Sequence, residues 1–520
     1  MFFDVVNSCA VFVVSLAAAY FFLAVGLGVR TLRRSHIPLG FQASVGFGHP
    51  FEPLAGAEPA SDRWKLYVLV PCLNEGAVIG ETVEALVDPL RRARIVVVDD
   101  GSDDDTAKVA RRAGGRQVTI VRRSGPDARK GKGAALNAGL AYVLHDVARR
   151  RYDPESVIVC VMDADGRLSD GAVDEVLPLF ENDDVGGVQL AVRIRNRDDN
   201  FLLQFQDHQF WTLSSLTQFG RVDTGTVSLG GNGQFTRLAA LLEVGERPWS
   251  GSLTEDLDLA ISLGTRGWTL TSAPRAAVDQ QGVSRLGPLV RQRTRWYQGH
   301  MMAIRRAPDV LRSPAMSHRA SLEMILYLLV PWVLDLPWSI LYHLILIEFA
   351  LRIFQQQSLG DGLAMQAVSV VVIYVLGFWP ALVTAAMAKA REPAMGWRHA
   401  LKLGHAFVIT NYLSYACAWR ALFRIVRGRH GWEKTHRLAQ PAPSLTALAR
   451  RRVSADGRLS FASTQYRAGT KLAGETVEVL CDGPLVHIHH QGVRVATHPR
   501  RHQPAAEAAA CRRGQQRLAA

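Results

Sequence analysis

Two groups of carboxylates in this sequence have the types and spacing of a site that handles a phosphorylated substrate. Asp99 and Asp100 end a β-branched run in VVVDDGSDDDT, and Asp163 and Asp165 end another in VIVCVMDADG. Ligands of α/β sheets bind beyond the carboxyl ends of the strands, which is where these acids are expected. Hard carboxylate oxygens favour Mg²⁺ or Mn²⁺, and such an ion bridges diphosphate oxygens.

A third group, Thr254-Glu255-Asp256 in SGSLTEDLDLA, opens a predicted helix. One interpretation is that Thr254 and the acids only cap that helix. The functional interpretation makes Asp256 a general base, because a carboxylate can take the proton from an acceptor hydroxyl that is held at a donor carbon.

A fourth group lies in RQRTRWYQGH, which contains Gln292, Arg293, Arg295 and Trp296. Arginine side chains can hold a leaving diphosphate through forked hydrogen bonds, and Trp296 offers a flat apolar face to a sugar ring. The alternative is a basic helix whose long side chains extend along a membrane surface.

The elements that must position these groups follow an alternating pattern. Predicted strands lie at 66–70, 94–98, 118–121, 157–162 and 185–192. Helical stretches, such as 80–90 and 106–113, lie between them. Strand-helix alternation predicts an α/β fold with a mostly parallel sheet and helices on both faces. The acidic groups would then meet at one edge of that sheet.

Long apolar segments flank this region. Residues 5–29 carry no charge and are long enough to span a bilayer, and Arg30, Arg33 and Arg34 follow them. The positive-inside rule therefore places the next part of the chain in the cytoplasm. Residues 320–426 are predicted to form further transmembrane and interface helices, and both two and four crossings fit the charge pattern.

The C-terminal part has a different character. Residues 448–498 contain short alternating runs with Asp482-Gly483 and Gln491-Gly492 at the turns, which predict a small β-barrel-like module. Residues 499–520 are predicted to be a disordered tail. The module is similar to a small β domain found at the end of some transposases and integrases. The formal net charge of the whole chain is +13, which suits nucleic acid, anionic lipid or a phosphorylated substrate.

Together, the four groups resemble the family-two glycosyltransferases, in particular the processive, membrane-bound branch with the cellulose, hyaluronan and poly-N-acetylglucosamine synthases. The resemblance runs from about residue 67 to residue 437 and includes VPCLNE, GKGAALNAG and GWEKTHR. It implies a nucleotide-diphospho-sugar transferase domain of GT-A type at residues 64–315. It also implies a multi-pass protein of the plasma (inner) membrane with its catalytic domain in the cytoplasm.

The resemblance implies roles for individual residues as well. Asp256 would be the base of an inverting displacement, and Asp163 and Asp165 would hold Mg²⁺ or Mn²⁺. The predicted donor-binding residues are Asn74, Glu75, Asp99, Asp100, Lys132, Asp163, Gln292, Arg293 and Arg295. The predicted acceptor-binding residues are Gly231, Asn232, Glu255 and Trp296.

Three functional hypotheses follow. The main one is a processive synthase that moves a sugar from UDP-glucose or UDP-N-acetylglucosamine to a growing β-linked polysaccharide and exports it across the bilayer. The alternative is non-processive transfer of a sugar to a lipid carrier. A hypothesis of another class is a nucleic-acid-binding membrane protein that uses its basic tail, although no nucleic-acid partner is expected. A homo-oligomer and accessory export proteins both stay open.

Overall fold

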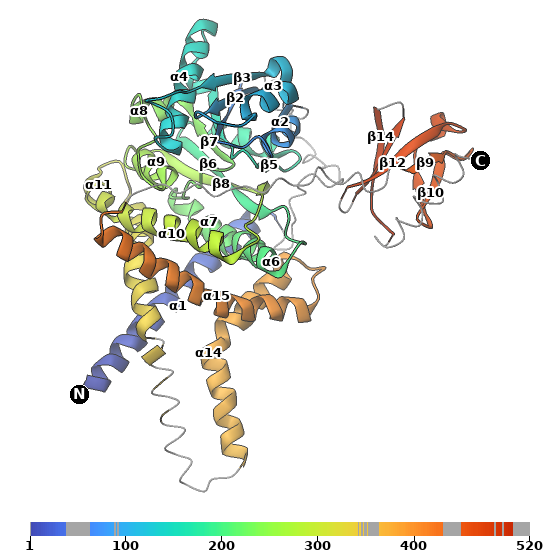
Figure 1. Ribbon diagram of the computed structural model, residues 1–520. Helices are drawn as coiled ribbons and strands as arrows, with labels where there is room; N and C mark the ends of the chain where they lie inside the picture. Colours follow the sequence, from blue (N-terminus) through green and yellow to red (C-terminus); the bar gives the residue numbers. More distant parts are fainter. Residues whose placement is uncertain are drawn as a thin grey trace. The chain divides into compact units, whose positions relative to one another are not determined.

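In the computed structural model, the described residues are 2–37, 63–87, 90, 93–341, 343–344, 347, 351, 363–429, 449–482, 485–490 and 493–502. The chain divides into two compact units, Met1–Ala43 with Ala57–Arg437 and Ser44–Gly56 with Leu438–Ala520 (Figure 1). The GWEKTHR segment lies outside the described residues, as does most of the predicted tail, from residue 503 onward.

The first unit is built on one eight-stranded sheet with the order β3-β2-β1-β4-β7-β6-β8-β5. The strands are β1 (Lys65–Cys72), β2 (Arg94–Asp99), β3 (Val118–Arg122), β4 (Val157–Val161), β5 (Arg167–Leu168), β6 (Val185–Ile194), β7 (Gln234–Arg237) and β8 (Thr269–Gln280). Strands β3, β2, β1 and β4 pair in parallel. Strand β7 is antiparallel to β4 and β6, β6 is parallel to β8, and β8 is antiparallel to β5.

The five predicted strands are present as β1, β2, β3, β4 and β6, but the sheet is mixed rather than mostly parallel. The difference arises at β7, which enters antiparallel between β4 and β6. Its sequence, Gln-Phe-Thr-Arg, has three polar residues and no apolar run, yet it is fully buried. Burial is possible because Arg237 donates to the backbone oxygens of Phe180 and Val185. A buried polar strand gives no hydrophobic signal in the sequence.

Helices cover both faces of the sheet, as Figure 1 shows. On one face lie α2 (Ile79–Val87), α3 (Thr106–Gly114) and α5 (Ala172–Val176). On the other lie α4 (Lys132–Arg150), α8 (Leu238–Val244) and α9 (Glu255–Gly264). Along β1, Val68 and Val70 pack on the first layer while Tyr67 and Leu69 pack on the second. Strands buried on both faces read as continuous apolar runs, which is why the sequence predicts them well.

The other helices of this unit lie beyond the sheet. They include α1 (Phe2–Arg34), α6 (Phe201–Asp207), the π-helical turn η4 (His208–Ser214), α7 (Ser215–Gly220), α10 (Leu286–Ala303), α11 (Ala307–Arg312), α12 (His318–Leu329), α14 (Leu363–Arg391) and α15 (Trp397–Val426). Helix α15 packs on α10 and α14, and α1 packs on α7. Among the described residues, one helical segment, His318–Leu341, is long and apolar enough to cross a bilayer.

The second unit contains the predicted small β module. Its strands are β9 (Ala449–Arg452), β10 (Arg458–Phe461), β11 (Thr464–Arg467), β12 (Thr476–Asp482), β13 (Leu485–His490) and β14 (Val493–Pro499). They form a four-stranded antiparallel sheet, β14-β13-β12-β9, and a separate β10-β11 hairpin. Phe461 of the hairpin and Val479 of the sheet share one apolar core. The described strands are therefore two packed sheets and not the barrel-like closure that the turn pattern predicts, because β10 and β11 pair only with each other.

A buried ion cluster on β6 ties the sheet to the helices below it. The Arg193 guanidinium lies 2.8 Å from Asp207 of α6 and 2.8 Å from Glu392, the residue after α14. The same guanidinium lies 4.5 Å from the centre of the Trp211 ring, and the Arg391 guanidinium lies 4.2 Å from it. One arginine therefore holds together a strand and two helical segments far apart in the sequence.

Replacing this arginine tests its contribution to stability. We expect Arg193→Met to lower the free energy of unfolding by about 3 to 5 kcal/mol, because Asp207 and Glu392 keep their charges without a buried cation. The matched control is Lys130→Met, which removes an exposed pair with Asp127 and should cost less than about 1 kcal/mol. Thermal unfolding of the purified full chain in detergent measures both, and equal losses would contradict the assignment.

Candidate active site

Three acidic segments meet at one edge of the sheet. Strands β2, β1 and β4 are parallel neighbours, so their carboxyl ends point the same way. Asp99 ends β2 and Asp100 follows it, Glu75 follows β1, and Asp163 and Asp165 follow β4. The sheet thus gathers carboxylates that are up to 90 positions apart in the sequence, as the strand pattern predicts.

A cavity of about 430 Å³ opens beyond this edge. The predicted site residues that line it are Glu75, Asp100, Lys132, Asp163, Asp165, Glu255, Asp256, Gln292, Arg295 and Trp296. The cavity therefore unites the strand ends with the starts of α4 and α9 and with one face of α10. A shared cavity is the geometry that the four sequence groups require, while the role of each residue stays a prediction.

Lys132 lies at the centre of the charged part of the cavity. Its Nζ donates to Asp163 Oδ1 at 2.7 Å and to the backbone oxygen of Gly231 at 3.2 Å, and lies 3.8 Å from Glu255. Burial alone would lower the pKa of Lys132, but the Asp163 and Glu255 carboxylates raise it above its ordinary value. The lysine is therefore a permanent cation in a pocket rich in carboxylates.

The glycine-rich loop before β7 approaches this cation closely. Gly231 has a φ of +71°, and a Cβ built there would lie 3.0 Å from Lys132 Nζ and 3.0 Å from Asp256 Oδ2. A side chain at this position would therefore meet both groups in a backbone conformation that favours glycine. The predicted acceptor-binding residue Gly231 thus lies beside Asp256 without lining the cavity itself.

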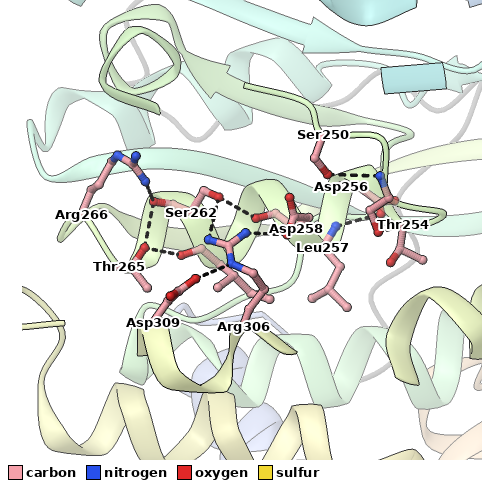
Figure 2. Close-up of polar contacts among 12 residues, drawn as sticks. Ser250, Thr254, Asp256, Leu257, Asp258, Ser262, Thr265, Arg266, Arg306 and Asp309 are labelled. Atoms are coloured by element: carbon pink, nitrogen blue, oxygen red, sulfur yellow. Dashed lines mark hydrogen bonds and ion pairs between the residues drawn. The ribbon is translucent and has the colours of Figure 1, made fainter. Parts of the chain in front are cut away.

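The aspartates of helix α9 have different surroundings. Asp256 Oδ1 accepts a hydrogen bond from the backbone N–H of Leu257 at 2.8 Å, and burial raises the pKa of Asp256. Figure 2 shows that Asp258, two residues later, reaches Arg306 instead, where Asp309 joins it. Of these aspartates, only Asp256 lines the cavity.

Helix α10 presents Gln292, Arg295 and Trp296 to the cavity. Their spacing of three and four residues places them on one helical face. The helix is held against the start of α9 at Gly299, where a Cβ would lie 2.5 Å from the methyl group of Thr254. Any larger residue at this crossing would push α10 away from Asp256.

Several predicted site residues are not among those that line the cavity. Asn74 and Asn232 hold loops in place, since the Asn74 side chain accepts the Asp103 N–H and the Asn232 side chain accepts the Asp163 N–H. Asp99 is buried and accepts the backbone N–H of Ser102. None of these three lines the cavity.

Arg293 also lies outside the cavity lining, on another face of α10 from Arg295. Its guanidinium lies 5.6 Å from the centre of the Trp296 ring and 5.9 Å from that of Phe210, and burial lowers its pKa. Direct contact with a donor diphosphate, as the sequence predicts for Arg293, therefore receives no support from its position. The position of Arg293 is instead consistent with its guanidinium supporting the Trp296 ring.

Another part of the cavity lining contains residues that were not predicted to be site residues. We call it the helical end, and its residues are Phe210, Ser214, Gln218, Ser228, His300 and Tyr327. The first two lie in the π-helical turn η4, a rare element that is frequent at functional sites. His300 alone carried a usable signal, because it follows Trp296 by four residues and so shares its helical face.

The carboxylates at the end of β4 suit a divalent ion. Asp165 Oδ2 accepts the backbone N–H of Gln281 at 2.8 Å, and both Asp163 and Asp165 line the cavity. The described residues contain no cluster of three or more His, Cys, Asp or Glu side chains placed to bind a metal. Two hard oxygen ligands fit an ion such as Mg²⁺, which keeps water and substrate phosphates in its remaining positions.

Comparison with known proteins identifies the domain that contains this cavity. Residues 63–299 match the family described as glycosyltransferase like family 2, and residues 438–508 match the Mu transposase C-terminal domain. Residues 63–299 are a family-two glycosyltransferase domain. A Mu transposase C-terminal-like domain follows it in the chain.

Three individual proteins show the range of similar sequences and structures. The beta-monoglucosyldiacylglycerol synthase of Trichormus variabilis is 29% identical over 292 residues, which is 53% of this chain and 58% of that protein. The poly-beta-1,6-N-acetyl-D-glucosamine synthase of Staphylococcus aureus is 27% identical over 236 residues, 44% of this chain and 53% of that protein. The chain thus spans a little over half the length of each of these two curated relatives.

Among solved structures, the mannosyltransferase PcManGT from Pyrobaculum calidifontis, determined in complex with GDP-Man and Mn²⁺, matches with a TM-score of 0.45. The match covers 80% of this chain and 99% of that chain, at 17% sequence identity.

Substitution of Asp256 tests its predicted role. We expect Asp256→Asn to lower sugar transfer by about 10² to 10⁴-fold, the usual contribution of a positioned base, while binding of the nucleotide-sugar is kept. Asp258→Asn is the matched control, since this residue lies on the same helix but outside the cavity. Release of nucleoside diphosphate measures transfer, and a comparable loss in both variants would contradict the role of Asp256.

The charges around Asp256 predict a dependence on pH. Burial and the neighbouring Asp256 raise the pKa of Glu255 to about 7, and burial raises the pKa of Asp256 as well. A base must be deprotonated to act, so kcat/KM should be constant at alkaline pH and fall on the acid side, at a pH above the ordinary pKa of an aspartate because burial raises the pKa of Asp256. Glu255→Gln should move this limb to lower pH, because it removes a like charge. An acid limb near 4 in the unaltered enzyme would count against the assignment.

Proposed function

We propose that the enzyme moves a hexose from a UDP-sugar to a hydroxyl group of a membrane lipid, with inversion and one sugar per acceptor. The observation that carries this proposal is the position of the helical end. Tyr327, which lines the cavity there, belongs to α12 and so to the apolar segment His318–Leu341. A lipid can approach along this segment with its head group in the cavity and its chains in hydrocarbon.

The charged end of the cavity suits the donor. Glu75 and Asp100 lie where the strand ends would receive the nucleotide, and Lys132, Gln292 and Arg295 would bind the diphosphate. Asp163 and Asp165 would hold Mg²⁺ or Mn²⁺, which neutralises charge on the leaving diphosphate when bound. The Mn²⁺ named for the mannosyltransferase structure belongs to that protein, and the ion used here is part of the proposal.

The transfer itself would proceed at Asp256. This carboxylate takes the proton of the acceptor hydroxyl while the acceptor oxygen attacks the anomeric carbon of the donor. The bond from that carbon to the diphosphate oxygen breaks on the opposite side, and UDP leaves with the electron pair. Attack from the face opposite the leaving group converts an α-linked donor into a β-linked product.

A lipid acceptor has more support than a growing polysaccharide. The first relative named above is a lipid glucosyltransferase by its name, whereas the polysaccharide synthase is less similar over a shorter stretch. The processive hypothesis is therefore the second candidate, and its motif at Gln292–Trp296 serves either acceptor.

The proposed setting is the inner membrane, with the catalytic domain at residues 64–315 on the cytoplasmic side. Membrane segments are proposed at residues 5–29 and within 320–426, and the number of crossings stays open between two and four. Helix α15 packs along α10, which favours an interface helix over a crossing for this element. Every residue of the candidate site belongs to the first unit.

The product distinguishes the two candidates. The purified full chain is incubated in lipid nanodiscs with radiolabelled UDP-glucose or UDP-N-acetylglucosamine, Mg²⁺ or Mn²⁺, and diacylglycerol or glucosyldiacylglycerol. We expect the label in an organic-soluble lipid with one added sugar, and loss of labelling when a chelator removes the metal. Asp256→Asn serves as the inactive control. A labelled product of high molecular weight would overturn the lipid proposal and favour the processive synthase.

A further inference from the structure

The helical end of the cavity is uncharged. The charged residues that line the cavity belong to the strand ends, the starts of α4 and α9, and Arg295 of α10. At the helical end, the described lining consists of aromatic rings, two serine hydroxyls, one amide and one imidazole. The Gln218 side chain accepts the backbone N–H of Ser228 at 2.9 Å, so its amide is held in place. None of the helical-end residues carries a cation, so a phosphate group would find no charged partner among these side chains to offset its desolvation.

The imidazole of His300 is fixed in one orientation. Its Nε2 lies 2.9 Å from the backbone oxygen of Tyr327, and its ring lies 4.6 Å from the Tyr327 ring at 31°. The Arg221 guanidinium lies 3.9 Å from the centre of the Tyr327 ring. It also lies 2.7 Å from the Glu323 carboxylate. The histidine is therefore packed against a side chain that is itself anchored.

This orientation determines the chemistry of the second ring nitrogen. A backbone oxygen only accepts hydrogen bonds, so Nε2 of His300 must carry the hydrogen and Nδ1 must carry a lone pair. Burial lowers the pKa of His300 to about 4, the bond to Tyr327 partly offsets this, and the charge of Arg221 lowers it further. The imidazole is neutral at physiological pH, its Nδ1 is a hydrogen-bond acceptor, and His300 lines the cavity.

We propose that His300 positions the lipid acceptor by accepting a hydrogen bond from a second hydroxyl of its head group, which makes an uncharged glycosylated lipid the preferred acceptor. The inference rests on the proposed lipid function. The reacting hydroxyl gives its hydrogen to Asp256, so His300 needs another hydroxyl. Plain diacylglycerol has one hydroxyl, whereas a sugar head group has several. Trp296 adds a flat face for that sugar ring, and its edge-to-face contact with Phe210, 6.1 Å between ring centres, fixes the ring.

The rate comparison that tests this uses three acceptors in nanodiscs: diacylglycerol, glucosyldiacylglycerol and a polyprenyl phosphate. We expect kcat/KM for glucosyldiacylglycerol to exceed that for diacylglycerol by about ten-fold, the worth of one hydrogen bond that the smaller acceptor cannot make. The polyprenyl phosphate should be the poorest acceptor. Equal use of the two glycerolipids, or preference for the phosphate, would overturn the proposal.

Substitutions of His300 test whether this residue causes the preference for glucosyldiacylglycerol over diacylglycerol. His300→Phe keeps a ring against Tyr327 but removes both nitrogens, so the ratio of the two kcat/KM values should fall to near one, mainly through a higher KM for the glycolipid. His300→Gln offers an amide oxygen in place of Nδ1 and should restore most of the ratio. His145→Phe, on an exposed face of α4, is the matched control and should leave every rate unchanged.

The two proposals fail in different ways. A polysaccharide product with no labelled lipid would remove the proposed function and this inference together. Lipid glycosylation whose acceptor preference survives His300→Phe would remove only the role of His300.

Discussion

The site depends on one buried cation that allows several carboxylates to share a cavity. Like charges so close together raise one another's pKa values and disfavour ionisation. Lys132 offsets this by contacting Asp163 and lying near Glu255, while it also bonds the backbone of the glycine-rich loop. Without this cation, the carboxylates of Asp163 and Glu255 would have less opposite charge near them. A lysine at the first residue of α4 therefore connects the donor side of the site to Asp256.

The same constraint explains why small residues recur around Asp256. The loop that reaches Lys132 does so at Gly231, and α10 reaches the start of α9 at Gly299. Both are places where backbone must come within contact distance of a charged or functional side chain. The charge arrangement and the close packing thus meet one requirement. Elements from distant parts of the sequence must all line a cavity of about 430 Å³. Donor diphosphate, with its metal, would bring further charge of both signs into this volume.

The sequence predicted the structure correctly where buried strands are apolar and the residues that follow them are acidic. Strands β1, β2 and β4 are apolar because both their faces are covered, and they end in acids because the carboxyl edge is open, so the sheet and its acidic edge were both predictable. Strand β7 was not predictable, because it is polar. Its burial is possible only because Arg237 donates hydrogen bonds to backbone oxygens. The motif around Trp296 identified the right helix, but letters alone do not give the phase of a helix, so Arg293 and Arg295 could not be told apart. Most of the helical end lies outside the motifs, since η4, α7 and α12 each contribute one or two ordinary residues, whereas His300 lies in the RQRTRWYQGH segment.

The attachment of α12 to the catalytic domain bears on how an acceptor enters. Glu323 pairs with Arg221 at 2.7 Å, and Tyr327 lies one helical turn later between Arg221 and His300. Because Arg221 is buried, breaking this pair would leave a charge in an apolar environment, which is costly. The first turns of α12 are therefore expected to stay fixed while substrates exchange. An acceptor that reaches the cavity along α12 then needs no movement of that helix, only lateral diffusion of the lipid to a head-group site that is already assembled.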